Sequence, residues 1–215
     1  MPIKRSYADH GDACATAHAM ELLGDRWTYP IVRELMLAPK RFSELAEGVR
    51  GITPATLTSR LRDLQAAGLV ERVELPAPAR ATAYEASAWA RELAPIFEAL
   101  GRWAQASPTR AVDGCGLTPD AMVQSMMTMA PERGPEQPLE LELRLRDDRE
   151  PNAPAYTYRL LWEKELQITR GQAPGAEVLE GDSSTLAGVL YEGAPVDELR
   201  VHGDEVRRLV AAFAG

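Results

Sequence analysis

The chain has 215 residues, of which 45% are hydrophobic and 26% charged, which is typical of a soluble protein with a hydrophobic core. No apolar run approaches the roughly 20 residues of a membrane helix, and the first ten residues lack the apolar stretch of a signal peptide, so we expect a cytoplasmic protein without membrane spans. The two cysteines, Cys14 and Cys115, are too few for a disulfide framework, and we expect their thiols to be reduced.

The net charge of −8 is distributed unevenly along the chain. Residues 1–107 hold 13 basic and 13 acidic side chains, whereas residues 108–215 hold 11 and 19. Within 26–80 there are 9 basic and 6 acidic side chains. Because DNA affinity depends on the local patch that meets phosphate, the acidic total does not exclude a nucleic-acid partner. If the chain binds DNA, the excess of acidic side chains over residues 108–215 predicts that this second half faces away from the DNA.

A change in composition divides the chain. The segment from Ser107 to Gly116 is rich in turn formers and poor in large apolar side chains. We therefore expect a first domain over residues 1–107, a linker over 108–117 and a second domain over 118–215.

Three helices are predicted at the start of the first domain. Apolar side chains at helical spacing predict a helix over 14–23, which Gly24 ends. A second helix is expected from Trp27 to Leu35, with Pro30 in its first turn, where proline is tolerated. Ser43 is expected to cap a third, short helix over 44–49.

A fourth helix and a hairpin follow. Thr53 is expected to cap a helix over 54–67, with Pro54 at its first position and Gly68 as its left-handed stop. Residues 69–75 alternate like a strand, 76–80 form a loop, and 81–86 return as the partner strand. Ser87 then caps one long helix, whose apolar face carries Trp89, Leu93, Ile96, Phe97, Leu100 and Trp103.

This order of elements is that of a winged helix-turn-helix, in which the helix 54–67 enters the major groove. Leu57, Leu61 and Leu64 fall on one side of that helix and are expected to face the core. The other side carries small side chains and one arginine, which would let the helix lie deep in a groove. The candidate DNA-binding residues are Arg41, Thr53, Ala55, Thr56, Thr58, Ser59, Arg60, Arg62 and Arg80.

The basic candidates have different expected roles. Arg62 is placed to bind a guanine edge, Arg60 lies on the flank and suits a phosphate, and Arg80 at the wing tip suits a phosphate or the minor groove. The alternative is an amphipathic surface helix with a solvated Arg62, and a solvated Arg80 on a hairpin. The surrounding order of elements favours DNA binding for the helix.

Motifs that span nearly all of residues 12–105 are distinctive. They are Cys14, Leu22-Leu23-Gly24-Asp25-Arg26-Trp27, Ile31-Val32-Arg33-Glu34-Leu35, Arg41-Phe42-Ser43-Glu44-Leu45, Gly51-Ile52-Thr53, Leu57-Thr58-Ser59-Arg60-Leu61-Arg62-Asp63-Leu64 and Ala67-Gly68-Leu69-Val70-Glu71-Arg72. Together they resemble the HxlR-type regulators. The resemblance implies a homodimer, built largely from the first and last helices of this domain, that reads an inverted repeat.

The same resemblance makes Cys14 a candidate redox residue, since several family members sense oxidants or electrophiles with a cysteine there. Its place near a helix start favours the thiolate, although Ala15 replaces the proline that often follows. The alternative is a small packing residue at a dimer contact. His10, Cys14 and His18 are spaced by four, but no fourth ligand is evident and His10 precedes the helix, so we expect no metal and no cofactor.

The second domain has an α+β pattern. Thr118 caps a Met-rich helix from Pro119, strands are expected over 139–146, 155–163 and 166–170, and helices near 183–191 and 203–213. The runs Glu180 to Leu190, Glu192-Gly193 and Val201 to Glu205 resemble a sterol-carrier-protein-type domain.

That second resemblance implies a sheet and a helix-lined apolar tunnel for a small hydrophobic ligand. The candidate effector-binding residues are Met122, Met126, Met127, Tyr158, Leu160 and Trp162. The alternative is that the methionines only fill a core.

The sequence thus predicts an α+β protein, a winged helix-turn-helix domain followed by a small sterol-carrier-like domain. Its expected function is transcription regulation by a homodimer on a palindromic operator, controlled by a hydrophobic ligand or by thiol oxidation. The alternative gives the second domain only a dimerising role. An enzyme is not expected, because a Gly-x-Ser-x-Gly, a phosphate-binding glycine loop, paired metal ligands and a Ser/His/Asp set are missing from the sequence.

Overall fold

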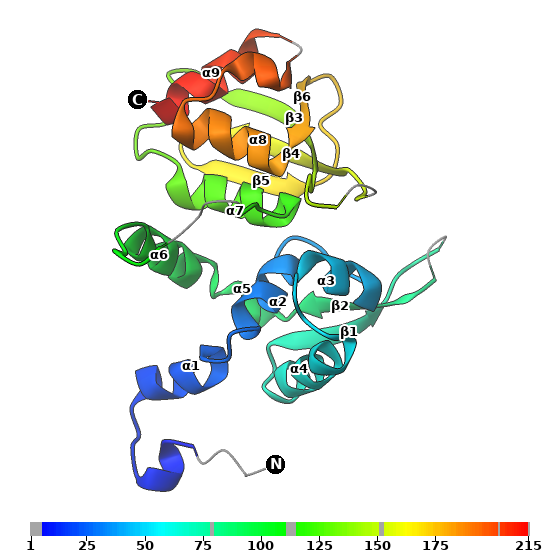
Figure 1. Cartoon of the computed structure of the whole chain (residues 1–215), viewed down its shortest axis with the longest axis vertical. Coiled ribbons are helices and arrows are strands. Elements are labelled where there is room, and N and C mark those ends of the chain that lie inside the picture. The colour runs from blue at the N-terminus through cyan, green and yellow to red at the C-terminus, as the bar shows by residue number, and fades with distance from the viewer. Residues whose placement is uncertain (1–5, 78–79, 111–114, 151–152, 202, 215) are drawn as a thin grey trace. The chain divides into compact units, whose positions relative to one another are not determined.

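The computed structural model describes residues 6–77, 80–110, 115–150, 153–201 and 203–214. The chain divides into two compact units, Met1–Ala94 and Pro95–Gly215. Figure 1 shows the elements of each unit. Within the described ranges, no helix is long and apolar enough to cross a bilayer.

The first unit is a winged helix-turn-helix, as predicted. A short 3-10 turn η1 (Ala8–His10) precedes α1 (Ala15–Leu23), α2 (Thr28–Leu35), α3 (Phe42–Gly48) and α4 (Pro54–Ala66). The hairpin strands β1 (Val70–Glu74) and β2 (Thr82–Ala86) are antiparallel, with Val70 opposite Ala86 and Glu74 opposite Thr82. Lys40 forms an isolated antiparallel bridge to β2, because its backbone N–H donates to the Tyr84 carbonyl at 2.9 Å and its carbonyl accepts from the Tyr84 N–H at 2.8 Å. The short α5 (Ala88–Arg91) follows.

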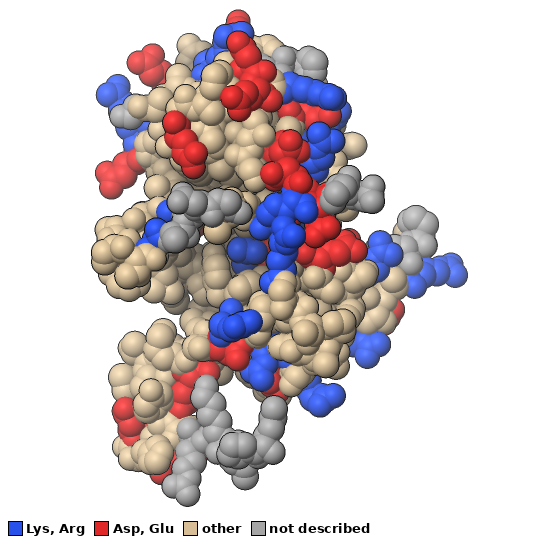
Figure 2. Space-filling model, in the orientation of Figure 1, with Lys and Arg blue, Asp and Glu red and all other residues tan. Residues whose placement is uncertain are grey.

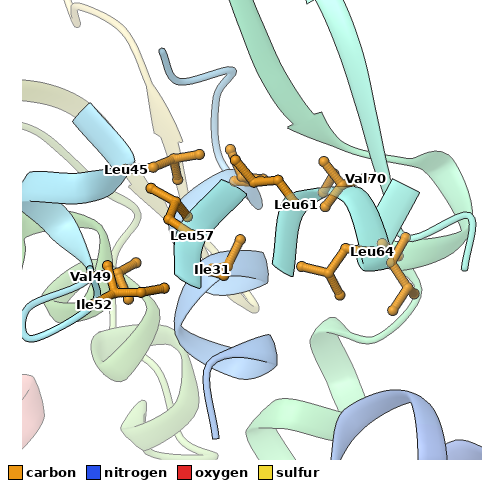
Figure 3. Close-up of a cluster of buried hydrophobic side chains, with 12 residues drawn as sticks. Ile31, Leu45, Val49, Ile52, Leu57, Leu61, Leu64 and Val70 are labelled. Atoms are coloured by element: carbon orange, nitrogen blue, oxygen red, sulfur yellow. The ribbon is translucent and has the colours of Figure 1, made fainter. Parts of the chain in front are cut away.

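The hydrophobic core of this unit lies between α2, α3, α4 and β1. Figure 3 shows the three leucines of α4 among Ile31, Leu45, Val49, Ile52 and Val70. Trp27 and Phe42 are partly buried against the same cluster. Since each fully buried leucine stabilises the fold by about 1.5–3 kcal/mol, this packing fixes which side of α4 remains outside.

Two helix boundaries differ from those expected. The third helix begins at Phe42, with Arg41 rather than Ser43 in the N-cap position, and the Glu44 carboxylate accepts the Arg41 backbone N–H at 2.8 Å. The long helix expected after Ser87 is interrupted, since α5 ends at Arg91 and α6 spans Ala94–Gln105. The cause is Pro95, which has no N–H to donate and whose ring would clash with the carbonyl four residues earlier.

The second unit joins α6 to an α+β sandwich of two layers. After α7 (Pro119–Met129) come β3 (Leu139–Arg146), β4 (Tyr156–Trp162), β5 (Leu166–Arg170) and β6 (Glu177–Asp182). Then follow α8 (Ser183–Ala187), the π-helical η2 (Gly188–Glu192), the 3-10 turn η3 (Val196–Glu198), β7 (Arg200–Val201) and α9 (Asp204–Ala214). The sheet order is β5-β4-β3-β6-β7, with β3 and β6 parallel and the other pairs antiparallel.

One face of this sheet is apolar and the other is charged. The alternation of β3 places Leu139, Leu141, Leu143 and Leu145 on the buried face, which α7 and α9 cover. Arg144 and Arg146 lie on the opposite, exposed face. The strand β6 was not expected from the sequence, because its side chains do not alternate in polarity.

Candidate nucleic-acid interface

The helix α4 is built so that one side remains open. Thr53 caps it, accepting the Thr56 backbone N–H at 3.2 Å, and Pro54 occupies the first turn. Gly68 follows the helix with φ of +74°, a conformation that glycine adopts without strain. Leu57, Leu61 and Leu64 are buried, so the rotation of the helix about its axis is set by the core.

Six of the residues predicted to meet DNA lie at the start of α4 or on its side away from the core. Thr53, Ala55, Thr58 and Arg62 are exposed, and Thr56 and Ser59 are half-buried. The hydroxyls are partly engaged, since Thr58 Oγ1 donates to the Pro54 carbonyl at 2.8 Å and the Thr53 and Thr56 hydroxyls lie 2.8 Å apart. A hydroxyl that donates inward still has lone pairs to accept with, so these side chains can receive donors from outside.

The arginines predicted to bind DNA differ in their partners. Arg62 is exposed and has no ion pair within the described residues. Arg60 pairs with Asp25 and with Asp63, both at 3.3 Å. Arg41 pairs with Glu44 at 3.3 Å. Among the described residues, Arg62 therefore has no carboxylate to release before its guanidinium could bind another acceptor, whereas Arg60 has two.

The wing carries Arg80. Its side chain is exposed and its φ is +35°, which is uncommon for a residue with a Cβ. Its backbone N–H reaches the Pro76 carbonyl at 3.3 Å. Positions 78–79 of the expected loop lie outside the described residues. Figure 2 shows basic side chains around the end of this hairpin.

Cys14 is the N-cap residue of α1 and is exposed. The backbone N–H groups of Ala17 and Thr16 hold the pKa of its thiol below the ordinary value, because they stabilise the thiolate. His10 lies in η1, so His10, Cys14 and His18 do not share one helix. The His18 ring contacts Glu21 at 3.3 Å, and the described residues hold no group of three or more His, Cys, Asp or Glu side chains suited to a metal.

The side chains predicted to bind an effector lie in the core of the second unit. Met127 is half-buried, and the others are at most 1% exposed; they are Met122, Met126, Tyr158, Leu160 and Trp162. Trp162 packs edge-on against Phe213 of α9, with ring centroids 5.4 Å apart. The structure thus brings these residues together between α7 and the buried face of the sheet, and all except Met127 are covered by protein.

A polar anchor beside these residues was not found from the sequence. Asp120, in the first turn of α7, accepts the Tyr158 hydroxyl at 2.7 Å and two Arg170 N–H groups at 3.0 and 2.8 Å. The Arg170 guanidinium lies 3.9 Å from the Tyr156 ring centroid. The partners are up to 50 positions apart in the chain, and no sequence pattern links them.

A hollow of about 110 Å³ lies on the charged face of the sheet, opposite the predicted effector residues. Its walls are polar, with Arg146 Nε 2.7 Å from Asp182 Oδ1 and Arg200 Nη1 3.3 Å from Glu180 Oε1. Such walls do not suit a hydrophobic ligand.

Comparison with known proteins concerns the first half of the chain. The family profile described as HxlR-like helix-turn-helix matches residues 22–111. The chain is 35% identical over 86 residues to the HTH-type transcriptional regulator YodB of Bacillus subtilis, a match that covers 40% of this chain and 77% of that protein. It is 36% identical over 89 residues to an HTH-type transcriptional regulator of Mycobacterium tuberculosis, covering 41% of this chain and 56% of that protein.

Among solved structures, the chain resembles the reduced form of YodB, with 31% identity, a TM-score of 0.41, and coverage of 46% of this chain and 97% of that one. The chain spans little more than half the length of the mycobacterial relative. The family profile ends at residue 111, so the resemblance of the second half to a sterol carrier stays a prediction.

Proposed function

Because the chain belongs to the HxlR-like helix-turn-helix family, we propose that it is a transcriptional regulator that binds duplex DNA at a specific sequence. The proposal rests on one observation. The face of α4 that carries Ala55, Thr58 and Arg62 is exposed over the length of the helix, while Leu57, Leu61 and Leu64 hold its other face in the core. A helix with small side chains around one arginine fits the major groove.

The operator we propose is an inverted repeat read by a homodimer. The helix α6 supports a two-fold assembly, since Ile96, Leu100 and Trp103 lie at helical spacing and are 44–77% exposed. Burying these side chains against a second copy would remove apolar surface from water. Two copies of α4 related by a two-fold axis call for a palindromic site.

We divide the chain into a DNA-binding and dimerisation domain over 1–107, a linker over 108–117 and an effector domain of sterol-carrier type over 118–215. Control would come from a small hydrophobic ligand that displaces Met122, Met126 and their neighbours, or from oxidation of Cys14. Methionine side chains adapt to irregular ligands, and the exposed Cys14 thiol has a lowered pKa. Either event would act by favouring one spacing of the two α4 helices.

A second candidate keeps DNA binding but makes the second domain a dimerising module only. The filled core favours it, since Met122, Met126, Tyr158 and Leu160 are fully buried against protein. Native mass spectrometry of the freshly purified chain separates the two candidates. A co-purified apolar molecule of constant mass would support an effector domain. A dimer without bound ligand, from which organic solvent also extracts no small molecule, would support a second domain that only dimerises.

Footprinting on the DNA upstream of its own gene tests the DNA-binding proposal. We expect protection of two half-sites about one helical turn apart. Arg62→Ala should cost about 1–3 kcal/mol of affinity and relax the preference at one base pair of each half-site. Arg159→Gln, on the exposed face of the sheet, is the control and should bind normally. Failure of the unaltered chain to prefer any site over mixed-sequence DNA would refute the proposal.

A further inference from the structure

Residues 25–27, between α1 and α2, contact the helix that is proposed to read DNA. The Asp25 carboxylate lies 3.3 Å from the Arg60 guanidinium on α4. Trp27 packs against the core cluster, and its ring edge (Cη2) is 3.8 Å from where a Cβ on Gly51 would stand, in the turn that leads into α4. The segment is therefore adjacent both to the middle of α4 and to the turn before it.

Arg26 lies between these two anchors and is exposed. Its guanidinium is 4.3 Å from the centroid of the Trp27 ring, within the range of a cation–π interaction. Within the described residues it has no ion pair, in contrast to Arg60, which two carboxylates share. Arg26 thus presents an uncompensated positive charge beside α4.

The Trp27 ring beneath Arg26 packs against the core, and a backbone hydrogen bond fixes the start of the residue. The Trp27 backbone N–H donates to Asp25 Oδ1 at 2.9 Å, and its side chain is partly buried. A guanidinium stacked on a fixed ring loses less side-chain freedom when it binds a ligand than one that is free in water. The N–H groups at the edge of the guanidinium remain available to oxygen acceptors while its face rests on the ring.

We propose that Arg26 is a DNA-binding residue that contacts a backbone phosphate beside the groove that α4 enters, and that Arg60 is a positioning residue held by Asp25. This inference rests on the proposed DNA-binding function. Phosphate is the fitting partner because Arg26 stands outside the exposed face of α4, where base edges would be read, and its charge is unpaired. Contact with a phosphate fixes the orientation of the protein on the duplex and carries no sequence information.

The test is the salt dependence of DNA binding by the full chain. The probes are fluorescein-labelled duplexes, one of the upstream DNA and one of 30 base pairs of mixed sequence, titrated between 50 and 200 mM KCl. Each phosphate contact contributes about 0.9 to the slope of log affinity against log salt, so Arg26→Gln in a dimer should reduce the slope by about 1.8 on both duplexes. Over this range the unaltered chain would then lose about 12-fold more affinity than the variant.

Two further variants make the result specific. Arg26→Lys keeps the charge and should restore most of the slope, and Arg159→Gln, which removes one exposed arginine from the second unit, should leave the slope unchanged. Equal thermal unfolding midpoints show that the variants are folded. An unchanged slope for Arg26→Gln, or a loss confined to the upstream duplex, overturns the role of Arg26 while leaving the proposed function intact. Absence of binding by the unaltered chain overturns both.

Discussion

Glu34 and Lys40 form an ion pair inside the first unit. Both side chains are buried, at 0% and 5% exposure, and Lys40 Nζ lies 2.5 Å from Glu34 Oε2. Arg33 Nη2 contacts the other carboxylate oxygen at 2.9 Å. The ion pair links Glu34 of α2 to Lys40, whose backbone is hydrogen-bonded to Tyr84 of β2.

Lys40→Met should therefore destabilise the protein by about 3–5 kcal/mol, because it removes a buried cation from a fully buried carboxylate. Urea unfolding followed by tryptophan fluorescence measures the loss. Arg41→Met is the matched control: its pair with Glu44 is exposed to water and should contribute about 1 kcal/mol or less. Equal losses for the two variants would contradict the burial argument.

The Cys14 thiol should react as a thiolate at lower pH than an ordinary thiol. Its pKa is lowered by the backbone N–H groups of Ala17 and Thr16, so alkylation by iodoacetamide should reach half its maximum rate below the pH needed by an unstructured cysteine peptide. The measurement uses Cys115→Ser, which leaves one thiol. Adding Ala17→Pro removes the first donor within the first helical turn, and the midpoint should rise. A midpoint equal to that of the peptide would show that the helix start has no effect.

At the level of elements, the Asp120 carboxylate links α7 to the sheet by hydrogen bonds. Asp120 is buried and receives hydrogen bonds from Tyr158 of β4 and Arg170 of β5. Asp120→Asn keeps the shape but leaves the partly buried guanidinium of Arg170 without its counter-charge, and we expect a loss of about 3 kcal/mol. Chemical unfolding monitored by near-ultraviolet circular dichroism checks this value. Asp148→Asn, at an exposed hydrogen bond to Ser184, should lose about 1 kcal/mol or less.

The elements that the sequence predicted well are those with strong local patterns. The spacing of Leu57, Leu61 and Leu64, with Thr53 and Gly68 at the ends, located α4 and its exposed face. Pro95 was a sequence signal for the break between α5 and α6, but the apolar side chains on both sides of it favoured one long helix. The strand β6 has no alternation to reveal it.

Pairings between distant residues could not be predicted. Neither the Asp25–Arg60 contact nor the Asp120–Arg170 contact has a sequence pattern, because each depends on how separate elements pack. For the same reason the sequence predicted which side chains of α4 are exposed, but it could not predict that Arg60 is paired with two carboxylates and Arg62 with none among the described residues.

For the whole molecule, the exposed stripe of α6 should determine the number of subunits. Trp103 is 77% exposed and lies one turn beyond Leu100. Trp103→Glu places a charge in the proposed interface and should give a monomer in native mass spectrometry, with at least about 10-fold weaker binding to an inverted repeat. Thr169→Glu adds the same charge on the outer face of the sheet and should remain dimeric. A dimeric Trp103→Glu would place the interface elsewhere.

The parallel pairing of β3 with β6 has a consequence for how the chain reaches its folded state. Strand β3 pairs with β4, the next strand along the chain, whereas the β6 residue that pairs with Leu141 is Glu177, 36 positions later in the sequence. Closing such a long loop is slow compared with packing helices, so the half with the sheet should fold after the helical half. Until β6 arrives, one edge of β3 is open to other chains, and the alternating Glu and Arg of that strand are what discourages aggregation during synthesis.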